Sequence, residues 1–393
     1  MLGEQNLDHD GAPAEPRHPP VIDKPVLIAE PLLPDLKDLI PLLEGIWERK
    51  YVTNHGPLHE QLEAALADHL GVKTAMLFNN ATIGLIAALK LFDLPPGSEV
   101  ITTPMTFAAT AHAISWNGLT PVFADILPGT MTLDPAAVEK AITSRTSAIL
   151  GVHVYGTLCD VDAFARIGAS RDIRIIYDAA HAFGATRSGV PVSQFGDASI
   201  FSFHATKLFN TLEGGLVATP RESDRKKIYY LRNFGIKNEE EVVEIGINGK
   251  MNEVQAAIGL LNLRLVAAEK AKRRRLRNRY IEILGDLDGI QLPAEQPEVE
   301  NSEQYFPIVI DETRFGRTRD QIYDALKARK VFSRKYFYPI CTDFEPYRHL
   351  KIVSTRAIPY AEEVKMRVLC LPFHSNVSED AVSVIHDVMH ARP

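Results

Sequence analysis

Between about residue 55 and residue 220, short apolar runs alternate with segments of helical pattern, and this alternation restricts the fold more than any other feature. Ala75–Phe78 and Glu99–Thr102 are apolar runs, and helical patterns follow them at Thr82–Phe92 and Phe107–Asn117. Further apolar runs stand at Pro121–Ala124, Ser147–Val154, Ile173–Tyr177, Ser199–Phe203 and Gly215–Ala218. Strands that alternate with helices predict a mostly parallel sheet with helices over both faces.

The chain has 393 residues, which is long enough for about two domains. Residues 1–24 are predicted to be a flexible tail, because the first 20 are polar and rich in proline. Residues 25–265 hold the alternating pattern and are predicted to form the large domain. Residues 266–393 are predicted to form a smaller C-terminal α/β domain. A long helical pattern from about Asn252 to Leu284 spans this boundary.

Composition and charge exclude several classes of function. The formal net charge of -7 gives no support to a role in nucleic-acid binding. No apolar run is long enough to span a bilayer, and no signal peptide is evident, so we expect a cytoplasmic protein without a membrane partner. The three cysteines lack metal-ligand spacing and are interpreted as reduced thiols, and we expect no metal site.

One lysine follows a predicted strand, in the region where sheets of this kind bind their ligands. Lys207 stands shortly after Ser199–Phe203 and is flanked by small and aromatic residues. Partial burial would lower the pKa of its amine and free the amine for Schiff-base chemistry. Taken alone, Lys207 could instead be a solvated lysine that caps a loop, as most lysines are exposed.

A carboxylate at the end of another predicted strand favours the first interpretation. Asp178 follows Ile173–Tyr177 and precedes Lys207 by 29 residues. Enzymes that use pyridoxal phosphate (PLP) need a carboxylate against the pyridine nitrogen, which keeps that nitrogen protonated. His181 lies three residues further on and could reach the cofactor hydroxyl. The alternatives are an aspartate that caps the next helix and a structural histidine.

A phosphate site is predicted where the run Ala75–Phe78 turns into the next helix. The N–H groups of Ala81 and Thr82 would open that helix, and a helix N-terminus favours an anion. Thr82 adds a hydroxyl to this site, and Ser202 could add a second one. Phe107 could stack on an aromatic cofactor ring, or it could simply be a core residue. The chain lacks a glycine-rich phosphate loop and a dinucleotide fingerprint, which argues against ATP and NAD.

Several motifs taken together resemble the DegT/DnrJ/EryC1/StrS family, which consists of sugar aminotransferases of PLP fold type I. The resemblance covers roughly residues 25–390. The motifs, in chain order, are Asn80-Ala81-Thr82, Thr103-Pro104-Met105-Thr106-Phe107, Asp178-Ala179-Ala180-His181, Ser202-Phe203-His204-Ala205-Thr206-Lys207, Glu213-Gly214-Gly215, Arg232-Asn233-Phe234-Gly235 and Gly246-Ile247-Asn248-Gly249-Lys250-Met251-Asn252-Glu253.

The resemblance implies an aspartate aminotransferase-like fold, with a mixed, mostly parallel seven-stranded sheet in the large domain. It implies PLP as cofactor, Lys207 as the Schiff-base lysine and Asp178 as the partner of the pyridine nitrogen. It implies His181 near the cofactor hydroxyl. It also implies that Phe107 lies on the ring and that Ala81, Thr82 and Ser202 lie at the phosphate. Asn248 would contact the phosphate of the neighbouring subunit, so the resemblance implies a homodimer with shared active sites.

The substrate is also implied only by resemblance. Asn80-Ala81-Thr82, His204-Ala205-Thr206-Lys207 and Phe337-Tyr338-Pro339 resemble the branch that acts at sugar C-4. This branch implies a dTDP-4-keto-6-deoxy sugar as substrate and L-glutamate as amino donor. An aminotransferase that acts at C-3 is the alternative. A PLP-binding protein without activity is a further one, which the paired Lys207 and Asp178 argue against.

A DNA-binding regulator is the alternative from another class, because one helical segment is strongly basic. Its basic residues are Lys270, Lys272, Arg273, Arg274, Arg275, Arg277 and Arg279. Their charges would spread around most of the helix circumference, and no helix-turn-helix signature is present. We interpret them as a solvated helix face or as partners of a substrate pyrophosphate.

Overall fold

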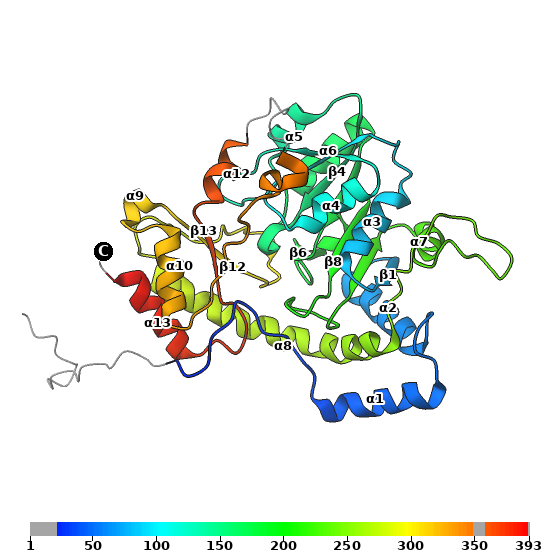
Figure 1. Cartoon of the computed structure of the whole chain (residues 1–393), viewed down its shortest axis with the longest axis horizontal. Coiled ribbons are helices and arrows are strands. Elements are labelled where there is room, and N and C mark those ends of the chain that lie inside the picture. Colours follow the sequence, from blue (N-terminus) through cyan, green and yellow to red (C-terminus); the bar gives the residue numbers. More distant parts are fainter. Residues whose placement is uncertain (1–21, 349–357, 392–393) are drawn as a thin grey trace, which may run out of the picture.

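The computed structural model describes residues 22–348 and 358–391, and it has a large α/β unit and a smaller one that share a long helix (Figure 1). Residues 1–21 of the predicted tail lie outside the described part. Ile22, which the same prediction assigned to the tail, packs in the core of the smaller unit. Within the described ranges, no helix is both long and apolar enough to cross a membrane.

The large unit is built on a seven-stranded sheet in the order β1-β9-β8-β5-β4-β2-β3. Its strands are β1 (Thr74–Phe78), β2 (Glu99–Thr102), β3 (Thr120–Phe123), β4 (Thr146–Val152), β5 (Arg174–Asp178), β8 (Ala198–Ser202) and β9 (Gly215–Thr219). In this sheet β9 runs antiparallel to its neighbours β1 and β8, and the other neighbouring pairs are parallel. The mixed, mostly parallel sheet that was predicted is therefore confirmed.

Helices cover both faces of this sheet (Figure 1). The helices of the large unit are α1 (Leu36–Arg49), α2 (Pro57–Leu70), α3 (Ala81–Leu91), α4 (Ala108–Trp116), α5 (Pro135–Ala141), α6 (Val161–Arg171), α7 (Asp224–Arg232) and the first part of α8 (Glu253–Leu284). Short 3-10 turns stand at η1 (Val154–Gly156) and η2 (Val192–Gln194). Helices α1 and α7 were not predicted.

The alternation of side chains along the strands explains why both faces are covered. On one face, Met76, Leu150 and Ile200 pack in a core with residues of α3, α4 and α7. On the opposite face, Leu77 and Phe201 pack with α2 and α8, and the neighbouring strands β4 and β5 pack with α5 and α6. Because every second residue points to the same face, strands buried on both sides read as continuous apolar runs.

The smaller unit has its own antiparallel sheet in the order β10-β12-β13. The elements of this part of the chain are β10 (Ile290–Gln291), β12 (Phe306–Ile310), α9 (Glu312–Phe315), α10 (Arg319–Ala328), η3 (Cys341–Asp343), η4 (Glu345–Tyr347), α12 (Pro359–Val364), β13 (Val368–Leu371) and α13 (Glu379–His390). Of these, η3 and η4 pack against α4 and β3 of the large unit. A third sheet joins β11 (Val299–Glu300) to the hairpin of β6 (Thr186–Arg187) and β7 (Val190–Pro191).

Helix α8 belongs to the hydrophobic cores of both units. Ala256 and Val266 pack in a core of the large unit, whereas Leu276 and Tyr280 pack in the core of the smaller one. Figure 1 shows the helix running from the side of α1 and α2 to α13. The domain boundary predicted between residues 265 and 266 falls inside this continuous helix.

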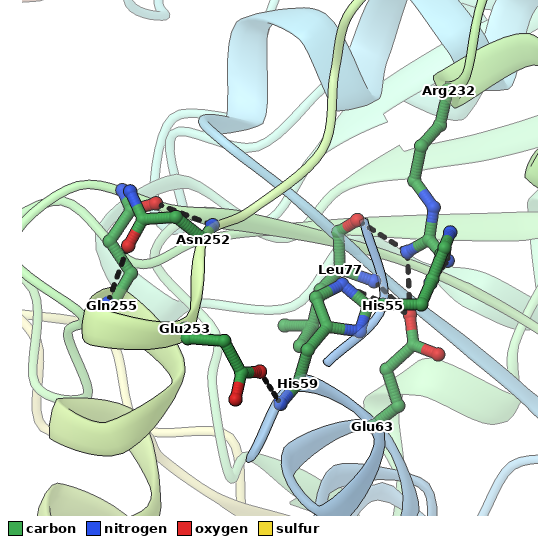
Figure 2. Close-up of polar contacts among 8 residues, drawn as sticks. All are labelled: His55, His59, Glu63, Leu77, Arg232, Asn252, Glu253 and Gln255. Atoms are coloured by element: carbon green, nitrogen blue, oxygen red, sulfur yellow. Dashed lines mark hydrogen bonds and ion pairs between the residues drawn. The ribbon is translucent and has the colours of Figure 1, made fainter. Parts of the chain in front are cut away.

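The N-terminus of α8 also fixes the start of α2. Asn252 and Gln255 form a capping box, in which each side chain accepts a hydrogen bond from the backbone N–H of the other (Figure 2). The buried Glu253 carboxylate accepts the N–H groups of Leu58 and His59 at 3.2 and 2.8 Å. These are N–H groups of the first turn of α2, which have no partner within their own helix.

A buried arginine joins α7, α2 and β1 beside that junction (Figure 2). The Arg232 guanidinium donates to Glu63 Oε1 at 2.5 Å and to the carbonyl of Leu77 at 2.6 Å, and it lies 3.0 Å from His55 Nδ1. Burial and the charge of Arg232 lower the pKa of His55 to about 4 and that of His59 to about 3. Ligand atoms of these histidines and Glu63 lie within 4.8 Å of one another, as in a metal site. Because the guanidinium already contacts Glu63 and His55, we interpret the cluster as an arginine-centred network.

Replacing Arg232 by methionine should destabilise the fold strongly, because the mostly buried Glu63 carboxylate would lose the positive charge that neutralises it. We expect a loss of about 3–5 kcal/mol in the free energy of unfolding, measured by urea denaturation. Arg367→Met is the matched control, since it removes a more exposed ion pair with Glu363 and should cost at most about 1 kcal/mol. Equal losses in the two variants would contradict a structural role for the buried network.

Candidate active site

A cavity of about 260 Å³ lies at the carboxyl ends of β5 and β8, where bound ligands were predicted. Asp178 ends β5, and the turn that carries Lys207 follows β8, which pairs with β5. Seven of the eight predicted site residues line this cavity, namely Ala81, Thr82, Phe107, Asp178, His181, Ser202 and Lys207. The eighth, Asn248, does not line it.

Lys207 is partly buried in an irregular turn, where its backbone N–H donates to the carbonyl of His204 at 2.9 Å. Its Nζ lies 5.6 Å from the centroid of the Tyr305 ring. Burial lowers the pKa of Lys207 to about 8, although the nearby Asp178 carboxylate acts in the opposite direction. A large share of the amine is therefore neutral near pH 8, and the neutral amine is the nucleophilic form.

Two hydrogen bonds hold the Asp178 carboxylate in place. Oδ2 accepts from the Thr110 hydroxyl at 2.7 Å, and Oδ1 accepts from the N–H of Ala180 at 3.1 Å. Burial raises the pKa of Asp178, while these two hydrogen bonds and Lys207 lower it. Residues 179–185 form turns, so Asp178 does not cap a helix, which was the alternative interpretation.

His181 is a buried, neutral imidazole with a defined tautomer. Its Nδ1 accepts the N–H of Tyr155 at 3.1 Å, which leaves the ring proton on Nε2. Burial and the charge of Lys207 hold the pKa of His181 well below its usual range. The ring also meets Tyr305 edge to face, with centroids 4.9 Å apart. His181 can therefore donate one hydrogen bond from Nε2 to an acceptor oxygen.

The N-terminus of α3 forms the end of the cavity suited to an anion. The Asn80 side chain accepts the N–H of Ile83 at 2.9 Å. The N–H groups of Ala81 and Thr82 also belong to the first turn and have no partner inside the helix. Strand β9 passes very close, because a Cβ on Gly215 would lie only 2.6 Å from the nitrogen of Ala81. Glycine is therefore required at position 215 for the helix end to sit against the sheet.

Ser202 and Phe107 complete the set of predicted residues around the cavity. Ser202 is the last residue of β8, and Phe107 stands at the N-cap position of α4 and is 64% exposed. Phe107 is therefore not a core residue, which was the alternative. An amine, a buried carboxylate, a helix N-terminus and an exposed aromatic ring in one cavity fit the groups of PLP.

Asn248 lies on the surface, in the loop that follows α7. Its backbone forms an isolated bridge with Asn233, and its Oδ1 accepts from Lys250 Nζ at 2.7 Å. The predicted contact of Asn248 with the phosphate of a neighbouring subunit stays a prediction. The position of Asn248 outside the cavity of its own chain is compatible with it.

Sequence reasoning missed two residues of the site, one that supports Asp178 and one that lines the cavity. Thr110, which holds Asp178, stands one helical turn after Thr106 and shares a 2.8 Å hydrogen bond with it, so the i, i+4 spacing was an available signal. Tyr305 lines the cavity from the position just before β12, in the predicted C-terminal domain. Its role could not be read from the sequence, because it lies about a hundred residues from the residues it contacts.

The basic run of α8 is largely paired with carboxylates of the same chain. Lys270 and Arg274 contact Glu300 at 3.0 and 3.1 Å, and Arg273 contacts the nearby Glu269 at 2.7 Å. Arg277 lies 3.9 Å from Glu303. Charges engaged within the chain do not form the free basic surface that a DNA-binding regulator requires.

Comparisons with known proteins agree with this geometry. The sequence model of the DegT/DnrJ/EryC1/StrS aminotransferase family matches residues 36–390. A dTDP-4-amino-4,6-dideoxy-D-glucose transaminase of Shigella dysenteriae is 42% identical over 364 residues, which are 93% of this chain and 98% of that protein. A protein of the same name from Escherichia coli is 42% identical, over 92% of this chain and 96% of its own.

Solved structures give the same result. The structure of DesI in the presence of its TDP-sugar product superimposes with a TM-score of 0.87 at 38% identity, covering 94% of this chain and 93% of that one. The PLP form of a sugar aminotransferase from Streptococcus pneumoniae, described as putative, superimposes with a TM-score of 0.85 at 25% identity. It covers 93% of this chain and 97% of its own. The predicted fold type is therefore confirmed.

The titration of Lys207 should depend on Asp178. In protein freed of cofactor, competitive acetylation followed by mass spectrometry should give Lys207 a midpoint near pH 8. Asp178→Asn removes the negative charge that stabilises the ammonium form, so the midpoint should fall by about half a unit or more. The exposed Lys73 serves as internal reference and should be unaffected. An unchanged or raised midpoint of Lys207 would show that the two groups do not interact.

Proposed function

Because the chain belongs to the DegT/DnrJ/EryC1/StrS family of PLP-dependent aminotransferases, we propose that it aminates a nucleotide-linked keto sugar at C-4. The proposed reaction converts dTDP-4-dehydro-6-deoxy-D-glucose to dTDP-4-amino-4,6-dideoxy-D-glucose, with L-glutamate as amino donor. The 42% identity to two transaminases of that name, over nearly their whole length, carries the proposal. The cavity around Lys207 and Asp178 supports it with the groups that the chemistry needs.

The chain's own residues would divide the work as follows. PLP, when bound, supplies an electron-accepting ring that makes the exchange of an amino group possible. Asp178 would hold the proton on the pyridine nitrogen, and its orientation is set by Thr110 and Ala180. Lys207 would hold the cofactor through Nζ and afterwards accept and return protons as a base, since its lowered pKa suits that task at neutral to mildly alkaline pH.

The remaining cavity residues would orient the cofactor. The N–H groups of Ala81 and Thr82 at the start of α3, with the hydroxyls of Thr82 and Ser202, would bind its phosphate. His181 would donate from Nε2 to the cofactor hydroxyl, because its Nδ1 is occupied by Tyr155. Phe107 would cover one face of the ring.

We also propose a homodimer in which each site receives Asn248 from the other chain. The loop before Asn248 exposes apolar side chains, with 86% of Ile245 accessible. Helix α1 adds more of them, and the exposed set is Leu36, Ile40, Trp47, Phe234, Ile236, Val242, Val243 and Ile245. So many exposed large apolar residues are typical of an interface.

The three cysteines are buried free thiols, which supports a reducing compartment such as the cytoplasm.

The substrate proposal predicts a specific product. Incubation of the enzyme with PLP, L-glutamate and dTDP-4-keto-6-deoxyglucose should yield the dTDP-amino sugar, detected by mass spectrometry, together with 2-oxoglutarate. The dTDP-3-keto isomer should yield at least about 100-fold less product, because the keto carbon would be displaced from the reacting atoms. Comparable amination of the 3-keto sugar would favour the C-3 alternative, and amination of neither would refute the substrate class.

The shared site predicts complementation between two inactive variants. Lys207→Ala removes the cofactor lysine but leaves a functional Asn248, whereas Asn248→Ala does the reverse. In a mixed dimer one site carries both changes and the other carries neither. Subunit exchange between the two variants should therefore restore up to about a quarter of wild-type activity. If mixed dimers form without recovery, and each single variant is impaired, Lys207 and Asn248 serve the same chain.

A further inference from the structure

The segment 302–304, which precedes β12, contacts the backbone at His181 and on both sides of Lys207. The Ser302 hydroxyl donates to the carbonyl of His181 at 2.6 Å. The buried Gln304 amide makes two backbone contacts, accepting the N–H of Leu208 at 2.7 Å and donating to the carbonyl of Thr206 at 3.2 Å. Residues 206 and 208 are the immediate neighbours of Lys207, so one side chain brackets the lysine from both sides.

This bracket matters because the turn around Lys207 belongs to no helix or strand. Residues 203–211 are irregular, and their backbone groups need partners from elsewhere in the chain. A lysine side chain has a flexible four-carbon stem, so the place of its amine depends on how firmly its backbone is held. The bracket fixes the peptide groups on both sides of that backbone.

The segment is itself anchored by the basic part of α8. Arg273 donates to the carbonyl of Glu303 at 3.3 Å, and its side chain is almost fully buried. Arg274 and Arg277 lie 3.6 and 3.9 Å from the buried Glu303 carboxylate. Gln304 is therefore presented to the lysine turn from a fixed backbone and not from a loose loop.

We propose that Gln304 is a positioning residue for Lys207, holding the lysine turn so that the amine stays in its partly desolvated place in the cavity. The proposal rests on the assignment of Lys207 as the cofactor lysine. Gln304 would touch neither the cofactor nor the substrate, and it would act only through the peptide groups of Thr206 and Leu208.

Gln296 provides a matched control in the same stretch of chain. Its amide makes an equivalent double contact with the backbone of Leu158, accepting the N–H at 2.9 Å and donating to the carbonyl at 2.9 Å. Neither Gln296 nor Leu158 lines the cavity. Gln304→Met and Gln296→Met thus both remove one bracketing amide while keeping a side chain of similar length, and only the first one borders Lys207.

The test compares these two variants with wild type in two measurements. In protein freed of cofactor, competitive acetylation should give Lys207 in Gln304→Met a midpoint at least half a pH unit higher, because water reaches the amine and the effect of burial is reduced. In the loaded enzyme, kcat should fall about tenfold or more, with KM for the sugar within threefold of wild type. Gln296→Met should match wild type in both measurements, even if it melts at a lower temperature.

The proposal is overturned if Gln304→Met and Gln296→Met show the same Lys207 midpoint and the same kcat. If Gln304→Met does not fold, Gln304→Asn against Gln296→Asn takes its place, since each keeps the amide but shortens its reach, and the same difference is expected. The acetylation experiment needs no sugar. A wild-type enzyme that fails to aminate the proposed substrate would therefore refute the proposed function without deciding the role of Gln304.

Discussion

The site depends on the parallel pairing of β5 with β8. In this register Asp178 lies opposite Ile200, so the end of β5 stands beside the last residues of β8. The carboxylate is then part of the sheet, while the lysine follows in the turn that the neighbouring strand leads into. Both groups are desolvated at the same buried edge. Desolvation raises the pKa of Asp178 and lowers the pKa of Lys207, so it favours the neutral form of each group.

Much of this arrangement could be predicted from local sequence pattern. Strand ends are visible as the point where an apolar run meets a polar residue, and parallel strands bring such ends to one edge of the sheet. The sequence pattern therefore predicts Asp178, Lys207 and Thr82 at the same edge of the sheet.

Two other features were missed, for different reasons. Helix α1 contains Pro41 and exposes Leu36, Ile40 and Trp47, but Leu39, Leu42, Leu43 and Ile46 follow helical spacing and pack on a core of the large unit. The sequence therefore carried a signal for this helix. Gln304 is an uncharged residue in a polar stretch, and its significance comes from partners about a hundred residues earlier. Only the tertiary fold brings those groups together.

The separation of Gln304 from Lys207 along the chain has a consequence for synthesis on the ribosome. The seven strands of the large sheet are complete once Thr219 has been made, so Asp178 and Lys207 can already be brought together in the nascent protein. The amide that brackets the lysine turn is added only some 85 residues later, followed by β12 and β13 of the smaller sheet. A chain that ends before Gln304 would lack this bracket, so the turn that is proposed to hold the cofactor would gain its support only late in translation.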